Sequence, residues 1–359
     1  MSIATCEFES HPAHQMEKFC IVLFAFLAMA CNPLKMEVIE QEDRGSHICQ
    51  LVEYNVSKQE RVRSFLLVPK GAETADKLPG LVLLHDHGAR FDIGKEKLVK
   101  PLASAPEHTK LSSQQWIDDN FDGVFFGDSL AALGYVVIVP DMLYWGGRST
   151  DVAQEWAKLN FCGGEGDIKL LKNQVYEGQR AVYDSLAAQN IIWAEQTINE
   201  DAVAAEVLMS LPYVDDDRIG CFGWSMGAHR AWLLTAFCEH IRTGVALCWM
   251  TLKETVKQPL KASDYSKLIP HLRDNYDFPD IAQALAPKPF YFLNGTQDKL
   301  FPLRSVEKSF EIMQGIYDEK GATGKLKTEL FDGPHHCGKD VQARIVDYLS
   351  DQLSADVQE

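Results

Sequence analysis

The sequence predicts an α/β protein with a mostly parallel central sheet, helices on both faces and an antiparallel hairpin near the N-terminus. After residue 80, short runs of consecutive apolar residues alternate with segments of helical spacing. Continuous apolar strands separated by helices are typical of a parallel sheet that is covered on both faces. Before residue 70, two segments alternate polar and apolar side chains instead, which is the pattern of a hairpin.

The predicted elements follow in chain order. Residues 49–56 and 62–68 are predicted to be antiparallel strands joined by the polar turn 57–60. The later strands are predicted at residues 81–84, 135–139, 219–222, 245–249, 290–293 and 326–331. Helices are predicted at residues 128–133, 179–192, 201–211, 305–317 and 340–353. We expect the segments 91–121 and 151–176 to be irregular loops at the open end of the sheet.

Length, composition and net charge limit the classes of protein to which this chain can belong. With 359 residues, 46% of them hydrophobic and 24% charged, the chain can bury a sizeable core. No repeats or low-complexity tracts divide it, so we expect a single domain over residues 32–359. A net charge of −16 argues against nucleic acid and anionic membrane surfaces as partners, because binding phosphates requires basic clusters.

Residues 1–31 are expected to be an upstream extension and an export signal. Residues 19–31 form an apolar run that is too short for a membrane span, which needs about 20 residues, but that suits a signal peptide. Small residues precede Cys31, as in bacterial lipoprotein signals, so Cys31 is the expected site of lipidation and membrane attachment. The alternative is a cytoplasmic protein in which this run forms a hydrophobic strand or helix.

The nine cysteines show no paired spacing that would indicate zinc binding or redox chemistry. We therefore expect no disulfide framework. One bridge among Cys49, Cys162, Cys238 and Cys337 stays open at this point.

The most informative motif is Gly223-Trp224-Ser225-Met226-Gly227. It follows the apolar run 219–222 and precedes a segment of helical spacing, and this strand, turn and helix are the context of a nucleophile elbow. Glycines suit positions 223 and 227 because side chains there would collide with the neighbouring strand and helix. Ser225 is therefore the candidate nucleophile.

An acid and a base follow in the order that such a site requires. Asp298 lies in the loop after the strand predicted at 290–293, and His335 lies after the strand predicted at 326–331. We expect Asp298 to orient the base and His335 to act as the base. His336 is the alternative base, and Asp332 is the alternative carboxylate.

Two backbone amides are expected to stabilise a negatively charged oxygen. The first belongs to Met226, at the start of a predicted helix, and the second to Ala89, after an early strand. The neighbouring run 85–87, His-Asp-His, contains residue types that bind zinc. Adjacent positions at a strand end point to opposite sides, however, so no metal and no cofactor is predicted. Several tryptophans, Trp145, Trp224 and Trp249, could stack on a sugar ring or belong to the core.

Several motifs carry a family resemblance. The elbow motif, with the segment 214–220 ahead of it, resembles the dienelactone hydrolase-like branch of the α/β-hydrolase superfamily. The segments 84–88, 94–97 and 140–148 resemble a bacterial subgroup described as acetyl xylan esterase-like, whose members are often exported. The chain departs from the pattern at Ala228, where a second glycine is common, and at His336 and Cys337, where relatives often carry an acidic and an aromatic residue.

The resemblance covers residues 62–353 and implies an α/β-hydrolase fold with a Ser-His-Asp triad and no cofactor. It implies a serine-dependent carboxylic ester hydrolase, acting on a small-molecule or oligosaccharide ester such as an acetylated carbohydrate. Two alternatives stay open. One is a serine hydrolase of the dienelactone hydrolase or prolyl oligopeptidase type. The other is a glycan-binding lipoprotein without activity, which the intact triad disfavours.

Overall fold

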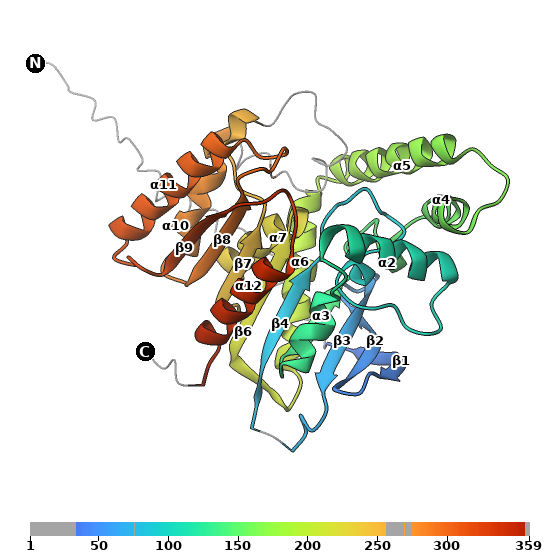
Figure 1. The fold of residues 1–359 in the computed structure, drawn as a ribbon, viewed down its shortest axis with the longest axis horizontal. Helices are drawn as coiled ribbons and strands as arrows, with labels where there is room; N and C mark the ends of the chain where they lie inside the picture. The colour runs from blue at the N-terminus through green and yellow to red at the C-terminus, as the bar shows by residue number, and fades with distance from the viewer. Residues whose placement is uncertain (1–33, 75, 256–268, 270–273, 356–359) are drawn as a thin grey trace, which may run out of the picture.

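The computed structural model of the chain describes residues 34–74, 76–255, 269 and 274–355 (Figure 1). The expected export segment 1–31, including Cys31, lies outside these residues. None of the helices in the described part is long and apolar enough to cross a membrane.

The described strands form one sheet of nine strands. In chain order they are β1 (Met36–Asp43), β2 (His47–Asn55), β3 (Arg61–Pro69), β4 (Leu78–Leu84), β5 (Val136–Pro140), β6 (Val214–Trp224), β7 (Thr243–Leu247), β8 (Phe290–Gly295) and β9 (Leu326–Phe331). Their order in the sheet is β1-β2-β3-β5-β4-β6-β7-β8-β9. Neighbours run parallel from β5 to β9, while β1, β2 and β3 pair antiparallel. The predicted mostly parallel sheet with an N-terminal antiparallel hairpin is confirmed.

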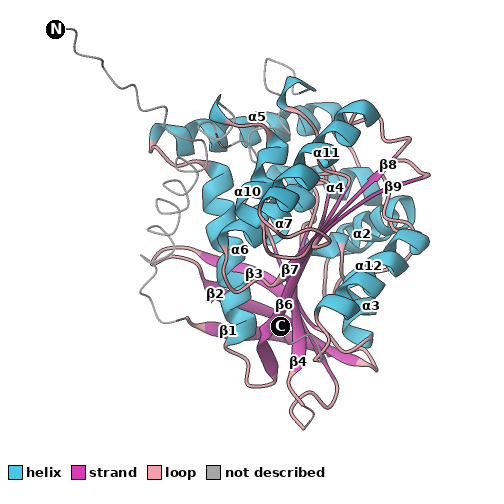
Figure 2. Cartoon of the chain, turned by 90° about the vertical axis from the view of Figure 1, so that its left-hand side faces the viewer, coloured by secondary structure: helices cyan, strands magenta, loops and turns pink. Residues whose placement is uncertain are grey.

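Helices cover both faces of this sheet (Figure 2). The α-helices are α2 (Glu107–Asn120), α3 (Phe126–Ala132), α4 (Asp151–Cys162), α5 (Ile168–Ala188), α6 (Trp193–Met209), α7 (Met226–Phe237), α10 (Ala282–Leu285), α11 (Leu303–Glu319) and α12 (Lys339–Gln352). The short 3-10 helices are η1 (Lys95–Lys97), η2 (Gly146–Arg148), η3 (Lys253–Thr255) and η4 (Phe278–Ile281). Helices α3 and α12 lie on one face, and α6, α7 and α11 lie on the other.

Strand β5 shows why this arrangement needs continuous apolar strands. Val137 and Val139 belong to the core that includes α3 and α12, whereas Val136 and Ile138 belong to the core that includes α6 and α7. Each strand residue is therefore buried, whichever face it points to.

The expectation of loops at residues 91–121 and 151–176 was wrong, because helices α2, α4 and α5 occupy much of these segments. Helix α2 is mostly polar, but α4 and α5 carry apolar residues at helical spacing, a signal that the prediction missed (Val152, Trp156 and Leu159 in α4; Leu171, Val175, Val182 and Leu186 in α5). The capping residues were a second available signal. The Thr150 side chain accepts from the backbone of α4, and the Asp167 side chain accepts from the backbone of α5.

Helices α4 and α5 form a hairpin that extends from the edge of the molecule (Figure 1). The predicted helix 179–192 is the second half of α5, which ends at Ala188. Strand β1 was not predicted, because most of its side chains are polar and none is fully buried. Cys162, the last residue of α4, is an exposed free thiol, and the other described cysteines are buried free thiols (Cys49, Cys221, Cys238, Cys248 and Cys337).

Candidate active site

Ser225 lies in the sharp turn between β6 and α7. Its backbone has φ +56° and ψ −123°, a left-handed conformation that costs a residue with a side chain about 1–3 kcal/mol. The surroundings hold it there, because the Ser225 N–H donates to the Leu247 carbonyl at 2.8 Å and its own carbonyl accepts from Ala228 at 2.8 Å. The strand, strained turn and helix have the geometry of a nucleophile elbow.

The two glycines of the motif are required by close backbone contacts. A Cβ atom on Gly223 would overlap the carbonyl of Gly227, and a Cβ atom on Gly227 would overlap the carbonyl of Leu84 at the end of β4. The elbow is therefore wedged between its own helix and the neighbouring strand, which fixes the position of Ser225.

His335 and Asp298 are brought together by the loops after β9 and β8. His335 Nδ1 lies 2.7 Å from Asp298 Oδ2, and Asp298 Oδ1 accepts from the Leu300 N–H at 2.8 Å. The His335 ring packs against the Trp224 ring, with 5.2 Å between centroids, so it lies beside the residue that precedes Ser225. A carboxylate bound to Nδ1 leaves Nε2 as the nitrogen that can exchange a proton.

The alternative base and the alternative carboxylate lie elsewhere. His336 Nε2 pairs with the exposed Asp122 at 2.8 Å, and Asp122 Oδ2 also accepts from the Lys339 backbone at the start of α12. Asp332 accepts from the Gln297 side chain at 2.8 Å on the surface. Neither residue is hydrogen-bonded to the Asp298–His335 pair, so the geometry favours His335 as the base.

A buried thiol completes the surroundings of this pair. The Cys248 sulfur, an Asp298 oxygen and a His335 nitrogen lie within 4.8 Å of one another. Burial and the nearby Asp298 carboxylate raise the pKa of the Cys248 thiol, so it stays protonated. A neutral thiol is a poor metal ligand, and Asp298 and His335 already bind each other, so we interpret this group as the predicted acid and base with a buried thiol beside them rather than as a metal centre.

The two expected oxyanion donors differ in their surroundings. Met226 begins α7, where the amide and the helix dipole favour a negative oxygen. Ala89 has φ +52°, and its N–H donates to Nδ1 of His87 at 3.1 Å. The Ala89 amide is thus engaged by a side chain two residues earlier, and its role as an oxyanion donor stays a prediction that requires this N–H to be shared with the substrate.

We define the oxyanion loop as residues 85–90. Side chains from other segments bind its backbone carbonyls. Lys97 Nζ donates to the carbonyls of Asp86 and His87 at 2.8 Å and 2.9 Å. Trp145 Nε1 also donates to the His87 carbonyl, at 3.1 Å. With these carbonyls turned toward Lys97 and Trp145, the loop presents its amides in a restricted set of directions.

Burial strongly affects the charged groups of the oxyanion loop. Lys97 is fully buried, and this lowers its pKa to about 8, even though its ammonium lies 3.6 Å from Asp86 Oδ2. Burial likewise raises the pKa of Asp86, whose carboxylate oxygens have no hydrogen-bond partner. The desolvation of both ions outweighs their mutual attraction.

His85 offers no nitrogen to a metal. Its Nε2 accepts from the Met142 N–H at 3.1 Å, so its Nδ1 carries the proton and donates to the Asp86 carbonyl at 2.9 Å. Burial, together with Arg230, lowers the pKa of His85 well below its usual value, which keeps it neutral. The hypothesis of a metal bound by residues 85–87 therefore finds no support in this geometry.

The motifs at residues 94–97 and 140–148 meet around one buried carboxylate. Asp141 accepts from the Lys95 ammonium at 2.7 Å, from the Lys95 N–H at 2.8 Å and from the Gly147 N–H at 2.8 Å. A side chain on Gly146 would overlap the Asp141 carboxylate. These residues tie the segment after β5 to the segment after the oxyanion loop, which is a structural role.

The tryptophans proposed for sugar stacking are core residues. Trp145, Trp224 and Trp249 are at most 3% exposed. Trp224 packs between Phe121 and His335, and Trp249 packs against His229. The sugar-stacking hypothesis was wrong, because no face of these rings is open to a ligand.

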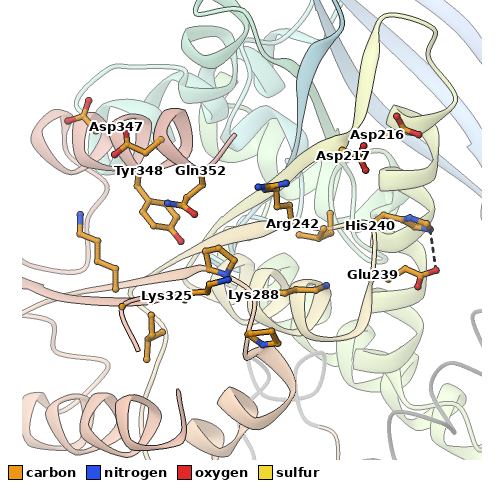
Figure 3. A pocket seen from close by; sticks show the side chains of 17 residues that line it. Asp216, Asp217, Glu239, His240, Arg242, Lys288, Lys325, Asp347, Tyr348 and Gln352 are labelled. Atoms are coloured by element: carbon orange, nitrogen blue, oxygen red, sulfur yellow. Dashed lines mark ion pairs between the residues drawn. The ribbon is translucent and has the colours of Figure 1, made fainter. Parts of the chain in front are cut away.

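A separate groove of about 890 Å³ lies at the amino ends of the strands, opposite the end at which Ser225 lies (Figure 3). It is lined by residues just ahead of β7, β8 and β9, whereas Ser225, Asp298 and His335 follow their strands. Figure 3 shows Arg242, Lys288 and Lys325 in the middle of this groove. Lys288 is used structurally, since its ammonium donates to the Thr235 and Cys238 carbonyls around the end of α7. The groove is therefore not part of the candidate active site.

Sequence reasoning missed the residues that support the site from a distance. Lys97 lies in the motif at residues 94–97, but no role was predicted for it. The contacts of Lys172 and Gln179 with the oxyanion loop were not predicted either. An apolar face on residues 172–179 was absent, and no local pattern links α5 to a loop more than 80 residues earlier. Glycine at position 88, which has φ +49°, was the available signal of a tight turn there, whereas the positive φ of Ala89 has no signal in the sequence.

Comparisons with known proteins identify the family of this chain. The sequence profile of the dienelactone hydrolase family matches residues 119–336, more than half of the chain. The "Putative hydrolase YtaP" of Bacillus subtilis (strain 168) is 26% identical over 293 residues, which are 81% of this chain and 83% of that protein.

Two solved structures share the fold. One is a "putative acetyl xylan esterase" from Bacteroides fragilis NCTC 9343. Its TM-score is 0.64 at 16% identity, with 90% of this chain and 77% of that chain covered. The other is a glucuronoyl esterase from Solibacter usitatus, with a TM-score of 0.60 at 13% identity and 96% and 94% coverage. The fold is that of the α/β-hydrolases, and the chain belongs to the dienelactone hydrolase family.

Proposed function

We propose that this protein is a serine-dependent carboxylic ester hydrolase that removes acetyl groups from acetylated carbohydrates. The observation that carries the proposal is the 2.7 Å contact between His335 Nδ1 and Asp298 Oδ2, formed beside an elbow that holds Ser225 at φ +56°. A serine hydroxyl becomes a good nucleophile when a base takes its proton and a third group orients that base. Membership of the dienelactone hydrolase family supports the same class of reaction.

The proposed reaction begins with attack of Ser225 Oγ on the carbonyl carbon of the ester. His335 Nε2 accepts the hydroxyl proton, while Asp298 holds the Nδ1–H and stabilises the imidazolium. The tetrahedral intermediate collapses when Nε2 returns this proton to the oxygen of the leaving alcohol. Water, activated by the same histidine, then attacks the acyl-enzyme and releases acetate and free Ser225.

The negative charge of the tetrahedral oxygen requires hydrogen-bond donors. The Met226 amide is the first proposed donor, because it begins α7 beside the nucleophile. The Ala89 amide is the second, and it must move from His87 Nδ1 toward the substrate. Loss of one such donor costs about a hundred- to a thousandfold in rate.

A hydrolysis assay with an aryl acetate tests the proposed nucleophile. Ser225→Ala should lower kcat by about 10⁴-fold or more, because removal of a triad member leaves only the binding and oxyanion contributions. Ser185→Ala, an exposed serine of α5, is the matched control and should keep the wild-type rate. Equal rates for wild type and Ser225→Ala would overturn the serine mechanism.

The proposed substrate class is tested separately from the nucleophile. An acetyl xylan esterase-like subgroup and a glucuronoyl esterase suggest two kinds of carbohydrate ester. Acetylated xylo-oligosaccharides and a methyl glucuronate ester should be offered in parallel, with release of acetate or methanol measured. Higher kcat/KM for the acetylated sugars supports the proposal, and turnover of the glucuronate ester alone contradicts it.

Export through Cys31 is a second part of the proposal, supported by the apolar run and the small residues ahead of this cysteine. In a bacterial host, radiolabelled palmitate should be incorporated into the wild-type chain but not into Cys31→Ser. Recovery of unlabelled, full-length protein in the cytoplasm would contradict it.

A further inference from the structure

Helix α5 contacts the oxyanion loop through one face. Lys172 and Gln179 are seven residues apart, about two helical turns, so their side chains lie on the same side of the helix. The buried residues of α5 are Val175 and Gln179, which lie on this face. The Tyr144 hydroxyl donates to the Val175 carbonyl at 2.6 Å, which ties the same face to the segment after β5.

The Ala89 N–H determines which nitrogen of His87 carries the proton, and Gln179 pairs with that nitrogen. The Ala89 N–H donates to His87 Nδ1, so in a neutral ring the proton is on Nε2. The side-chain amide nitrogen of Gln179 lies 3.3 Å from that Nε2, and the Gln179 Oε1 is buried without a partner. Two donors cannot bond each other. Turning the amide by 180° places Oε1 against the Nε2–H and satisfies both groups.

Lys172 contacts the backbone carbonyl of Ala89, the residue whose N–H donates to His87. Its ammonium donates to the Ala89 carbonyl and lies 3.8 Å from the centroid of the Trp156 ring of α4. Burial lowers the pKa of Lys172 to about 8. The N–H of Ala89 is thus held through His87 and Gln179, while its carbonyl is held by Lys172, and both of these side chains come from α5.

We infer that α5 is a positioning element for the proposed oxyanion hole, with Gln179 fixing the His87 ring and Lys172 fixing the Ala89 carbonyl. The inference rests on the proposed esterase function. It assigns Lys172 and Gln179 as positioning residues that act through the loop. Before the oxyanion forms, the neutral imidazole of His87 keeps the Ala89 N–H away from water and in one direction. A developing oxyanion is a stronger acceptor, because a charge-assisted hydrogen bond is roughly twice as strong as a neutral one.

The test compares each residue with a matched exposed residue of the same helix. Gln179→Leu should lower kcat for an aryl acetate about tenfold or more and leave KM within about twofold, since the lost contact matters only when the oxyanion forms. Gln174→Leu makes the same change on the exposed side and should keep the wild-type kcat. Lys172→Met against the exposed Lys169→Met repeats the design, and Lys172→Arg, which still donates to a carbonyl, should recover part of the activity.

A transition-state analogue separates positioning from damage to the fold. A phenylboronic acid forms a tetrahedral adduct with a catalytic serine, so its inhibition constant should rise in Gln179→Leu by the same factor by which kcat falls. If Gln179→Leu and Lys172→Met match their controls in kcat and in boronic acid binding, or if kcat rises, the inference is overturned while the esterase function stands. If wild type neither hydrolyses esters nor binds the boronic acid, the proposed function falls and this inference falls with it.

Discussion

The elbow at residues 223–227 and the oxyanion loop at residues 85–90 meet at the same site but are held by different forces. The elbow is fixed by backbone contacts that only glycine allows, and 11 of the 12 residues of the helix behind it, α7, are buried. The oxyanion loop is fixed by hydrogen bonds from Lys97 and Trp145 and by one from the Ala89 N–H to His87, and the helix that contacts it, α5, buries two of 21 residues. The nucleophile is therefore held by packing, whereas the loop is held by polar side chains, whose hydrogen bonds change with substitution or protonation.

The largest expected effect is on the chemistry of the triad. His335→Ala should lower kcat for an aryl acetate by about 10⁴-fold or more, because Ser225 then lacks a base. His336→Ala removes only a surface pair with Asp122 and should change kcat by less than about threefold. A large loss in His336→Ala with little loss in His335→Ala would reverse the assignment.

The next effect tests the packing of the elbow. Gly227→Ala should lower the free energy of unfolding by about 4 kcal/mol, because the new methyl group overlaps the Leu84 carbonyl of β4. Gly315→Ala in α11, where a methyl group would meet nothing within 4 Å, is the control and should stabilise the protein by about 1 kcal/mol. Urea denaturation measures both. A near-neutral Gly227→Ala would show that the elbow can relax.

The polar side of the comparison is tested by Lys97→Met. It removes one member of a buried ion pair and one of the two donors to each of the Asp86 and His87 carbonyls, so it should cost about 3 kcal/mol of unfolding free energy. Combining it with Asp86→Asn should recover part of that cost, because the remaining buried charge is then gone. Additive costs in the double variant would mean that the two charges do not interact.

The smallest expected effect is a pH dependence that belongs to the loop alone. The pKa of Lys97 in the folded protein, about 8, is below the value of about 10.4 expected in the unfolded chain. The unfolded state binds more protons between these two values, so the contribution of Lys97 to the free energy of unfolding rises with pH there. The difference between wild type and Lys97→Met should grow by about 1–2 kcal/mol from pH 7.5 to 9.5.

In the same window, the cost of Gly227→Ala should stay constant, because its overlap with a backbone carbonyl involves no titrating group. Lys172, whose pKa is also lowered to about 8, is repelled by Lys97 and titrates in the same window, so both proteins should carry Lys172→Met, which removes its titration from their difference. A flat difference for Lys97→Met would indicate that this lysine titrates normally in the folded state.

The two regions also differ in how far the sequence alone predicted them. The elbow could be predicted because a buried strand, a glycine-flanked serine and an apolar helix follow one another within about 20 residues. Asp298 could be placed because the strand ahead of it is a continuous apolar run, and His335 because it follows the more alternating strand at residues 326–331 and precedes the last helix. The choice between His335 and His336 depends on which ring reaches Asp298, and only the structure describes that contact.

The supports of the loop could not be predicted, for physical reasons. Lysine is rarely fully buried, so composition places Lys97 on the surface, yet it is 0% exposed. Helix α5 was only half predicted: apolar residues recur at helical spacing along it, but the polar stretches 172–174 and 177–180 between them obscured its first half. The contact between Gln179 and His87 joins residues 92 positions apart, and no local pattern encodes it.

The exposed Cys162 has a practical consequence. It ends α4, beside the α5 helix that contacts the oxyanion loop, and it is the exposed thiol among cysteines that are otherwise buried in the described residues. With Cys6, Cys20 and Cys31 replaced by serine, a maleimide dye should attach at this one accessible place. Such a dye would turn the helical hairpin into an optical reporter, whose fluorescence polarisation could be followed while substrate is turned over.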